Sequence, residues 1–103
     1  MKSIEKQGLF EVIESFAIRS RNQFYFIGKI KEGKIQEDWF VNIPLNSTLS
    51  LSVRINSIEE IEMTSEKEPY TLLIVNCDDQ AIDTYMALNV RLEYLQVTIE
   101  GED

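Results

Sequence analysis

The sequence predicts an all-β fold, a small closed or partly open antiparallel β-barrel of six or more strands with at most a short helix. Apolar and polar residues alternate with the period of a strand over most of the chain, and short polar turns separate these segments. No segment sustains a helical period. The length of 103 residues allows one hydrophobic core, so a single domain over residues 1–103 is expected. Because so small a sheet must cover its own apolar face, a barrel is favoured.

The N-terminal part of the chain predicts a short helix followed by a half-buried strand. Residues 4–9 are amphipathic and are expected to form a helix that plugs one end of the barrel. Residues 10–18 alternate with a period of two, which indicates a strand with one buried face. The residues expected on that buried face are Phe10, Val12, Phe16 and Ile18.

The next segment predicts a β-hairpin centred on a glycine. Residues 23–31 form a strand that is apolar on both faces near its start, with Gly28 in the middle, where a missing side chain permits sharp coiling. Gly33 accepts a positive φ without a Cβ clash, so the chain is expected to turn there. A return strand then runs from position 35 to position 43 and stops at Pro44, which has no N–H for a ladder.

The second half of the chain begins with its clearest amphipathic strand. Residues 49–55 alternate strictly between apolar and polar side chains after a turn at Asn46-Ser47. The phase slips after Asn56, which indicates a bend or bulge of the kind that small barrels need. Residues 64–69 are read as a polar surface loop, and residues 70–76 are apolar enough for a central strand.

The C-terminal part is less regular. Residues 78–87 fit either a helical turn or a structured loop. Residues 88–94 alternate as a strand, and the alternation resumes one step out of phase over residues 95–99, which suggests a second bulge. Residues 101–103 are expected to be a frayed end.

Residues 24–41 carry a resemblance to a known fold. An aromatic and apolar strand, the pattern Gly-x-apolar-x-x-Gly-x-apolar and a second hydrophobic strand resemble the opening of domain 2 of elongation factor Tu and related translational GTPases. The resemblance implies a small β-barrel that binds RNA or protein through its surface. Asp38 stands where relatives usually have a third glycine. The phosphate loop Gly-x-x-x-x-Gly-Lys-Ser/Thr is absent, so nucleotide hydrolysis is not implied.

The charge balance points to a protein partner. A net charge of −8 opposes general nucleic-acid binding, because a phosphate-binding surface normally shows a basic excess. Residues 1–35 hold seven Lys and Arg against four acids, whereas the remainder holds three against fourteen. A mildly basic edge on an acidic body suggests a partner with a cationic patch. The alternative is that most of these charges only solvate the surface.

The residues assemble no catalytic or metal site. The absence of histidine excludes histidine bases and the common nucleophile–histidine pairs. Cys77 precedes two acids that raise a thiol pKa, so a structural cysteine is favoured over a nucleophile. Asp78, Asp79 and Asp83 lack the order of an EF-hand, which favours a solvated loop over a metal site. No enzyme activity, cofactor or metal is therefore expected.

Composition also bears on location and on strand edges. Apolar runs such as residues 72–75 are far shorter than the roughly 20 residues that span a bilayer, and the charged N-terminus does not fit a secretory signal. A lone cysteine permits a reducing compartment. A cytoplasmic protein without a membrane partner is expected, and no oligomeric state follows. Glu59, Glu60 and Glu62 are read as a wet strand edge that resists edge-to-edge pairing.

The leading hypothesis is a non-catalytic module that binds a protein through an acidic surface, as an adaptor or an immunity-like inhibitor of a basic partner. The alternative is a translation-factor-like barrel that binds RNA or the ribosome, since aromatic and basic residues together stack bases and hold phosphates. Strand alternation sends about half of the aromatic side chains inward. A small-ligand barrel has no positive feature. The candidate partner contacts are Arg19, Arg21, Lys29, Lys31, Lys34, Tyr25 and Phe40.

Overall fold

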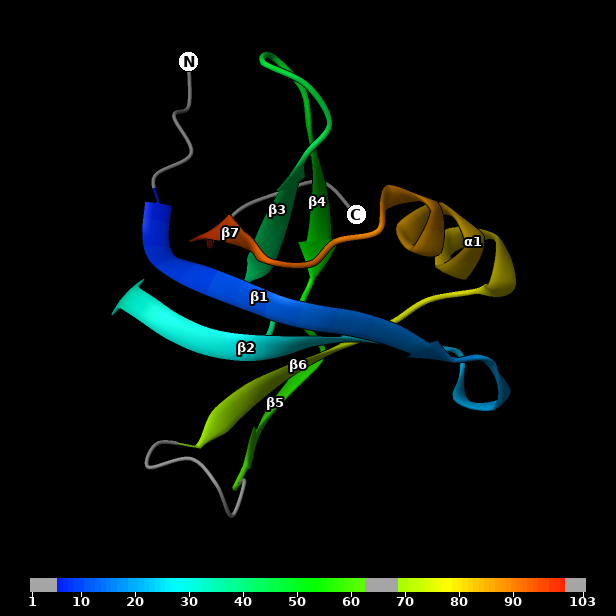
Figure 1. Cartoon of the computed structure of the whole chain (residues 1–103), viewed down its shortest axis with the longest axis horizontal. Helices are drawn as coiled ribbons and strands as arrows, with labels where there is room; N and C mark the ends of the chain where they lie inside the picture. Colours follow the sequence, from blue (N-terminus) through cyan, green and yellow to red (C-terminus); the bar gives the residue numbers. More distant parts are fainter. Residues whose placement is uncertain (1–5, 63–68, 100–103) are drawn as a thin grey trace.

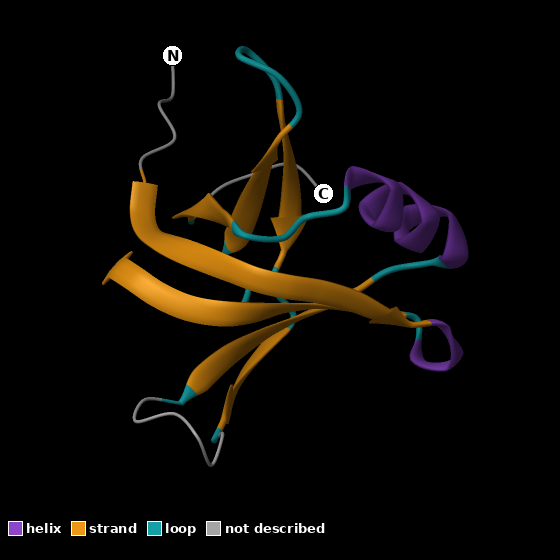
Figure 2. Ribbon diagram, in the orientation of Figure 1, coloured by secondary structure: helices purple, strands orange, loops and turns teal. Residues whose placement is uncertain are grey.

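A computed structural model describes residues 6–62 and 69–99, which form one antiparallel sheet accompanied by a short helix (Figure 1). This arrangement confirms the predicted mostly β fold, although the sheet is not closed into a barrel. Two helices lie at one end of the sheet (Figure 2): η1 (Arg19–Arg21) and α1 (Asp79–Leu88). The strands are β1 (Lys6–Ile18), β2 (Gln23–Gly33), β3 (Phe40–Pro44), β4 (Ser50–Arg54), β5 (Ser57–Ile61), β6 (Tyr70–Asn76) and β7 (Glu93–Thr98).

The two edge strands of the sheet are consecutive in the sequence. The strand order is β4-β3-β7-β1-β2-β6-β5, so β4 and β5 lie at opposite edges although only Ile55 and Asn56 separate them. The chain changes partner at this point: Ile55 N donates to Trp39 O (2.8 Å), whereas Asn56 N donates to Ile74 O (2.7 Å). The sheet therefore curls until its two edges meet at a bend, which confirms the irregularity predicted after Asn56.

The curled sheet encloses one main hydrophobic core. Alternate residues of six strands point into it, as the period of two requires. Tyr85 of α1 packs edge-on against the ring of Phe24, and the side chain of Ile82 is fully buried, so α1 adds apolar surface at one end of the core. The buried members of this core are Phe10, Val12, Phe24, Phe26, Val41, Ile43, Val53, Ile55, Leu73, Val75, Val90, Leu95 and Val97.

β1 and β2 form a long hairpin whose register shifts at a bulge. Val12 lies opposite Gly28 and Glu14 lies opposite Ile27, so one residue of β1 is left without a partner between them. This extra residue reverses the faces of the rest of β1. The prediction that Phe16 and Ile18 share a buried face with Phe10 and Val12 is therefore wrong, because Phe16 and Ile18 lie on the outer face.

The predicted hairpin of residues 23–31 with residues 35–43 is not formed. β2 pairs with β1 and β6, whereas β3 pairs with β4 and β7. Gly33 does adopt a positive φ of 66°, but it lies against the start of β1, where Lys34 N donates to Gln7 O (3.1 Å). The chain then crosses to the other side of the sheet before β3. The resemblance to the elongation-factor domain had relied on this hairpin.

The remaining predictions meet mixed outcomes. β6 is an inner strand with the bounds expected. Of the strand predicted over residues 49–55, β4 covers Ser50–Arg54 with Val53 buried, whereas Leu49, predicted to be on the buried face, lies outside the strand and is 60% exposed. The ambiguous segment before Asn89 is the helix α1. The strand predicted over residues 88–94 is wrong for residues 88–92, because the helix ends at Leu88 and Leu92 has a φ of 53°; Glu93 and Tyr94 begin β7. β1 already begins at Lys6, so residues 6–9 are strand and not helix.

The predicted loop over residues 64–69 and the predicted frayed end lie largely or wholly outside the described residues. Within the described part, neither η1 nor α1 has the length and apolarity of a membrane-spanning helix.

Candidate protein-interaction surfaces

Most of the basic residues proposed as partner contacts are engaged within the molecule. Arg19 pairs with Asp83 and lies 3.7 Å from Asp79, and these contacts join the β1–β2 turn to α1. The Lys31 ammonium lies 3.4 Å from the carboxylate of Glu11, and the Lys29 ammonium lies 5.1 Å from the centre of the Tyr70 ring. Three of the five proposed cations thus already contact a carboxylate or an aromatic ring within the molecule.

The basic residues also do not form one patch. Arg21 lies before β2 and Lys34 after it, and neither has an acidic partner among the described residues. A strand as long as β2 separates its ends by roughly 30 Å. The proposed aromatic contacts are buried, since Tyr25 is 4% and Phe40 is 3% exposed. Arg54 covers the Phe40 ring at 4.7 Å, so neither ring is available to stack on a base.

A group of unpaired carboxylates lies along β5, at the edge of the sheet. We call this group the acidic edge; its members are Glu37, Glu59, Glu60 and Glu62. All four side chains are exposed, and none pairs with a Lys or Arg in the described part of the chain. Glu37 is held beside β5 because its Oε2 accepts a hydrogen bond from Ile58 N (3.4 Å). The edge position of β5 confirms the strand edge predicted from its glutamates.

Apolar side chains also gather on the outside of the sheet: Phe16 is 42% exposed, whereas Tyr25, Leu72 and Ile74 are largely buried at 4%, 9% and 6% exposure. We call this surface the outer apolar face; its members are Phe16, Ile18, Tyr25, Ile27, Ile61, Leu72 and Ile74. They come from four adjacent strands, because Phe16 pairs with Tyr25, Tyr25 with Ile74, and Ile74 with Ser57 of β5. The Phe16 ring is 42% exposed and stacks on the Tyr25 ring at 5.0 Å.

The outer apolar face is hollowed into a groove of about 360 Å³. Besides apolar side chains, Arg21 lines it at the β1–β2 turn, and Glu59 and Ser57 line it on β5. The hydroxyl of Tyr25 donates to the amide oxygen of Gln23, so its polar atom is satisfied at the groove wall. The sequence signalled this face only through the strand that is apolar on both sides at its start.

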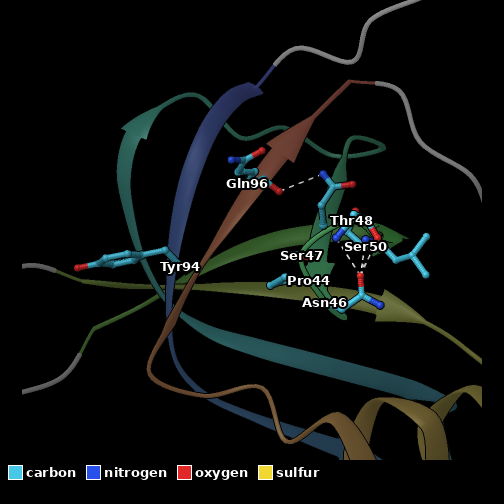
Figure 3. A pocket seen from close by; sticks show the side chains of 9 residues that line it. Pro44, Asn46, Ser47, Thr48, Ser50, Tyr94 and Gln96 are labelled. Atoms are coloured by element: carbon cyan, nitrogen blue, oxygen red, sulfur yellow. Dashed lines mark hydrogen bonds between the residues drawn. The ribbon is translucent and has the colours of Figure 1, made fainter.

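A second, uncharged hollow lies beside the β3–β4 hairpin (Figure 3). Its volume is about 280 Å³, and all nine residues that line it are neutral. Its polar groups largely bond to one another: Asn42 donates to Gln96 O and accepts from Ser52, and Asn46 accepts from the backbone N–H groups of Thr48 and Leu49. These hydrogen bonds stabilise the hairpin, so the hollow has a structural explanation.

The cysteine and the aspartates near α1 have structural roles. Partial burial raises the pKa of the Cys77 thiol, and the charges of Asp78 and Asp79 raise it further, so the reactive thiolate is disfavoured. Asp78 accepts a hydrogen bond from Ala81 N (2.8 Å) as the N-cap of α1. Among the described residues, no three His, Cys, Asp or Glu side chains are placed to hold a metal ion.

The described side chains thus offer two surfaces suited to binding, the acidic edge and the outer apolar face. No protein-family model matches the sequence, and the searches of curated proteins and of solved structures gave no match either.

Proposed function

We propose that this protein is a non-catalytic binding module that docks a cationic protein partner on its acidic edge. The observation that supports this proposal is the unequal pairing of its charges. Acids on β1 and β2 are paired with Lys or Arg, as in Glu11 with Lys31 and Glu14 with Arg91, whereas the acids along β5 have no such partner in the described part.

Unpaired carboxylates are the ones that contribute most to binding a cation. A paired carboxylate must first lose its internal partner, whereas an exposed and unpaired one loses only water. Several like charges on one strand edge also repel one another, and a cationic surface relieves this repulsion. Charges of this kind accelerate association and select partners of opposite sign, and they add less to affinity.

The alternative, an RNA-binding surface, has weaker support. Such a surface needs a continuous row of cations beside exposed aromatic rings. Here three of the five proposed cations already have an internal partner, the other two lie at opposite ends of β2, and Tyr25 and Phe40 are buried. The acidic edge is therefore the better-supported site.

The test compares two triple variants with the same net charge. Glu37→Gln/Glu60→Gln/Glu62→Gln removes unpaired acids, and Glu11→Gln/Glu14→Gln/Glu32→Gln removes acids that pair with Lys31, Arg91 and Lys6. The wild-type chain, immobilised as bait, is expected to retain a basic protein that mass spectrometry identifies. The first variant should lose about tenfold or more in affinity for that protein, and the second should lose much less.

Isothermal titration calorimetry with the purified partner provides the affinities. Added salt should weaken binding to the wild type more than binding to the first variant, because screening acts on the charges removed there. Equal losses in both variants would argue against the acidic edge. Retention of nucleic acid that a ribonuclease releases would favour the RNA alternative instead.

A further inference from the structure

We infer that the outer apolar face is a self-association surface, and that a second copy of this chain covers it through a two-fold contact. The inference does not depend on the proposed function: the two surfaces share Glu59, but the variant that tests the acidic edge leaves Glu59 unchanged. It rests on the apolar character of that face, on the groove in it and on the arrangement of two charges at its rim.

The apolar character is unusual for the outside of a single curled sheet. Antiparallel strands with one solvated face normally place polar side chains there. Here adjacent β1, β2, β6 and β5 all contribute apolar side chains to the outer face. Helix α1 packs on the other face, where Tyr85 contacts Phe24, and η1 reaches the rim of the outer face only through Arg21. A contiguous apolar patch with a polar rim indicates an interaction site more often than a single exposed apolar residue does.

The rim charges identify the occupant. In the sheet register, Phe16, Tyr25 and Ile74 form a row across the middle of the face. Arg21 lies at the β1–β2 turn, so along the strand direction it lies on one side of this row. Glu59 lies on β5, the strand farthest from β1 in this group, and pairs with Leu72, on the opposite side of the row from that turn. Both side chains line the groove, so a cation and an anion lie at diagonally opposite corners of the apolar patch.

This diagonal arrangement is self-complementary. In a two-fold contact, residue i of one copy meets residue j of the other, and j meets i. A two-fold axis perpendicular to the Arg21–Glu59 diagonal places Arg21 of each copy against Glu59 of the other. The contact then gains two opposite-charge pairs and brings no like charges together at these corners, while the apolar centres pack on each other. A uniformly cationic partner would instead place its charge against Arg21.

The dimer is expected to be weak. A face four strands wide is smaller than the roughly 800 Å² that each partner contributes to a standard interface, and two chains of net charge −8 repel each other at a distance. Sedimentation velocity at physiological ionic strength, at up to about 1 mM protein, covers the range in which such an interface is populated. A wild-type chain that stays monomeric at that concentration would overturn the inference.

Charge exchange tests the predicted pairing directly. Arg21→Glu and Glu59→Arg each place like charges against each other at both symmetric contacts, so each should weaken dimerisation at least about tenfold. The double variant Arg21→Glu/Glu59→Arg restores opposite charges and keeps the net charge of −8. It should therefore dimerise about as well as the wild type, a result that no general charge effect reproduces.

Matched controls separate this contact from nonspecific repulsion. Lys34→Glu changes the net charge as Arg21→Glu does, and Glu60→Arg changes it as Glu59→Arg does, but neither residue lines the groove. Both controls should dimerise within about threefold of the wild type, because Lys34 lies at the far end of β2 and the side chain of Glu60 points to the face of β5 opposite that of Glu59. Phe16→Ser, at a half-exposed ring, should abolish the dimer while circular dichroism shows an unchanged fold. A dimer that survives both single exchanges, or that the double exchange fails to restore, would refute the proposed geometry.

Discussion

Gly28 lies where the backbones of β1 and β2 approach most tightly beside the bulge in β1. A Cβ at this position would lie 1.8 Å from Glu11 O, a carbonyl oxygen of the neighbouring backbone. Because that atom belongs to the main chain, no side-chain rotation can relieve the contact. The missing side chain thus allows the two strands to coil around the core at the bulge.

Gly28→Ala is therefore expected to lower the free energy of unfolding by about 3 kcal/mol, because the two backbones must move apart. Urea denaturation followed by circular dichroism measures this loss. Ser20→Ala, at an exposed position in η1, serves as the control and should change stability by less than about 0.5 kcal/mol. An alanine variant as stable as the wild type would show that the strands can separate without cost.

At the scale of single elements, α1 depends on its two ends and on a few side chains. Asp78 caps its first turn, Ile82 inserts into the molecule, and Arg19 pairs with Asp83 on its exposed side. The helix has only ten residues, which is too short for stability on its own in water. Its persistence therefore depends on these local contacts and on the packing of Tyr85 against Phe24.

Asp78→Ala should cost about 1 kcal/mol of stability, because the N–H of Ala81 loses its acceptor. Asp78→Asn keeps an oxygen at the same place, and asparagine is an equally good N-cap, so this variant should retain most of the stability. Thermal melts of the three proteins decide between a capping role and a charge role. Equal losses in both variants would assign the effect to the charge of Asp78.

Individual strands could be predicted from the sequence, whereas their pairing could not. The alternation of residues 49–55 and the apolar run of residues 70–76 each indicate a strand without reference to any neighbour. The partners of β2 depend on which strands place their backbone N–H and C=O groups beside it, and these are β1 and β6. The bulge in β1 is invisible to a count of alternation, so the outer position of Phe16 could not be foreseen.

The candidate surfaces likewise include features that the sequence predicts and features that depend on how the strands pair. The glutamates of β5 predicted an exposed strand edge because charged residues close together on one strand resist pairing. The basic residues of the first third of the chain gave a misleading picture. Arg19 is neutralised by Asp83 of the distant α1, and Lys31 by Glu11 across the β1–β2 pair, so both contacts depend on the folded arrangement. The outer apolar face requires the register of four strands, which sequence alone does not supply.

For the molecule as a whole, the bend at Ile55 joins the two edges of the sheet. The Ile55 side chain is completely buried, and its backbone N and O both bond to the chain just before β3. The next residue already bonds to β6. Both halves of the curled sheet therefore share this point, and we expect them to unfold together.

Ile55→Ala should destabilise the protein by about 3 kcal/mol through the cavity that it leaves. The fluorescence of Trp39, the single tryptophan of the chain, reports on the β3 side, and far-ultraviolet circular dichroism reports on the whole sheet. The two transitions should coincide in the wild type and in the variant. Leu49→Ala, at an exposed position, should change stability little. Separate midpoints for the two signals would contradict a shared cooperative unit.

The pairing of β1 with β7 governs when the chain can fold during its synthesis. β1 lies in the middle of the sheet, yet one of its two neighbours is β7, the last of the described strands to be synthesised. Until residue 98 emerges, that side of the β1–β2 hairpin has no partner, and the β3–β4 hairpin has no strand pairing with the rest of the sheet. Contacts so distant in sequence slow folding, and the nascent chain must keep open strands from pairing with other chains until β7 has been synthesised.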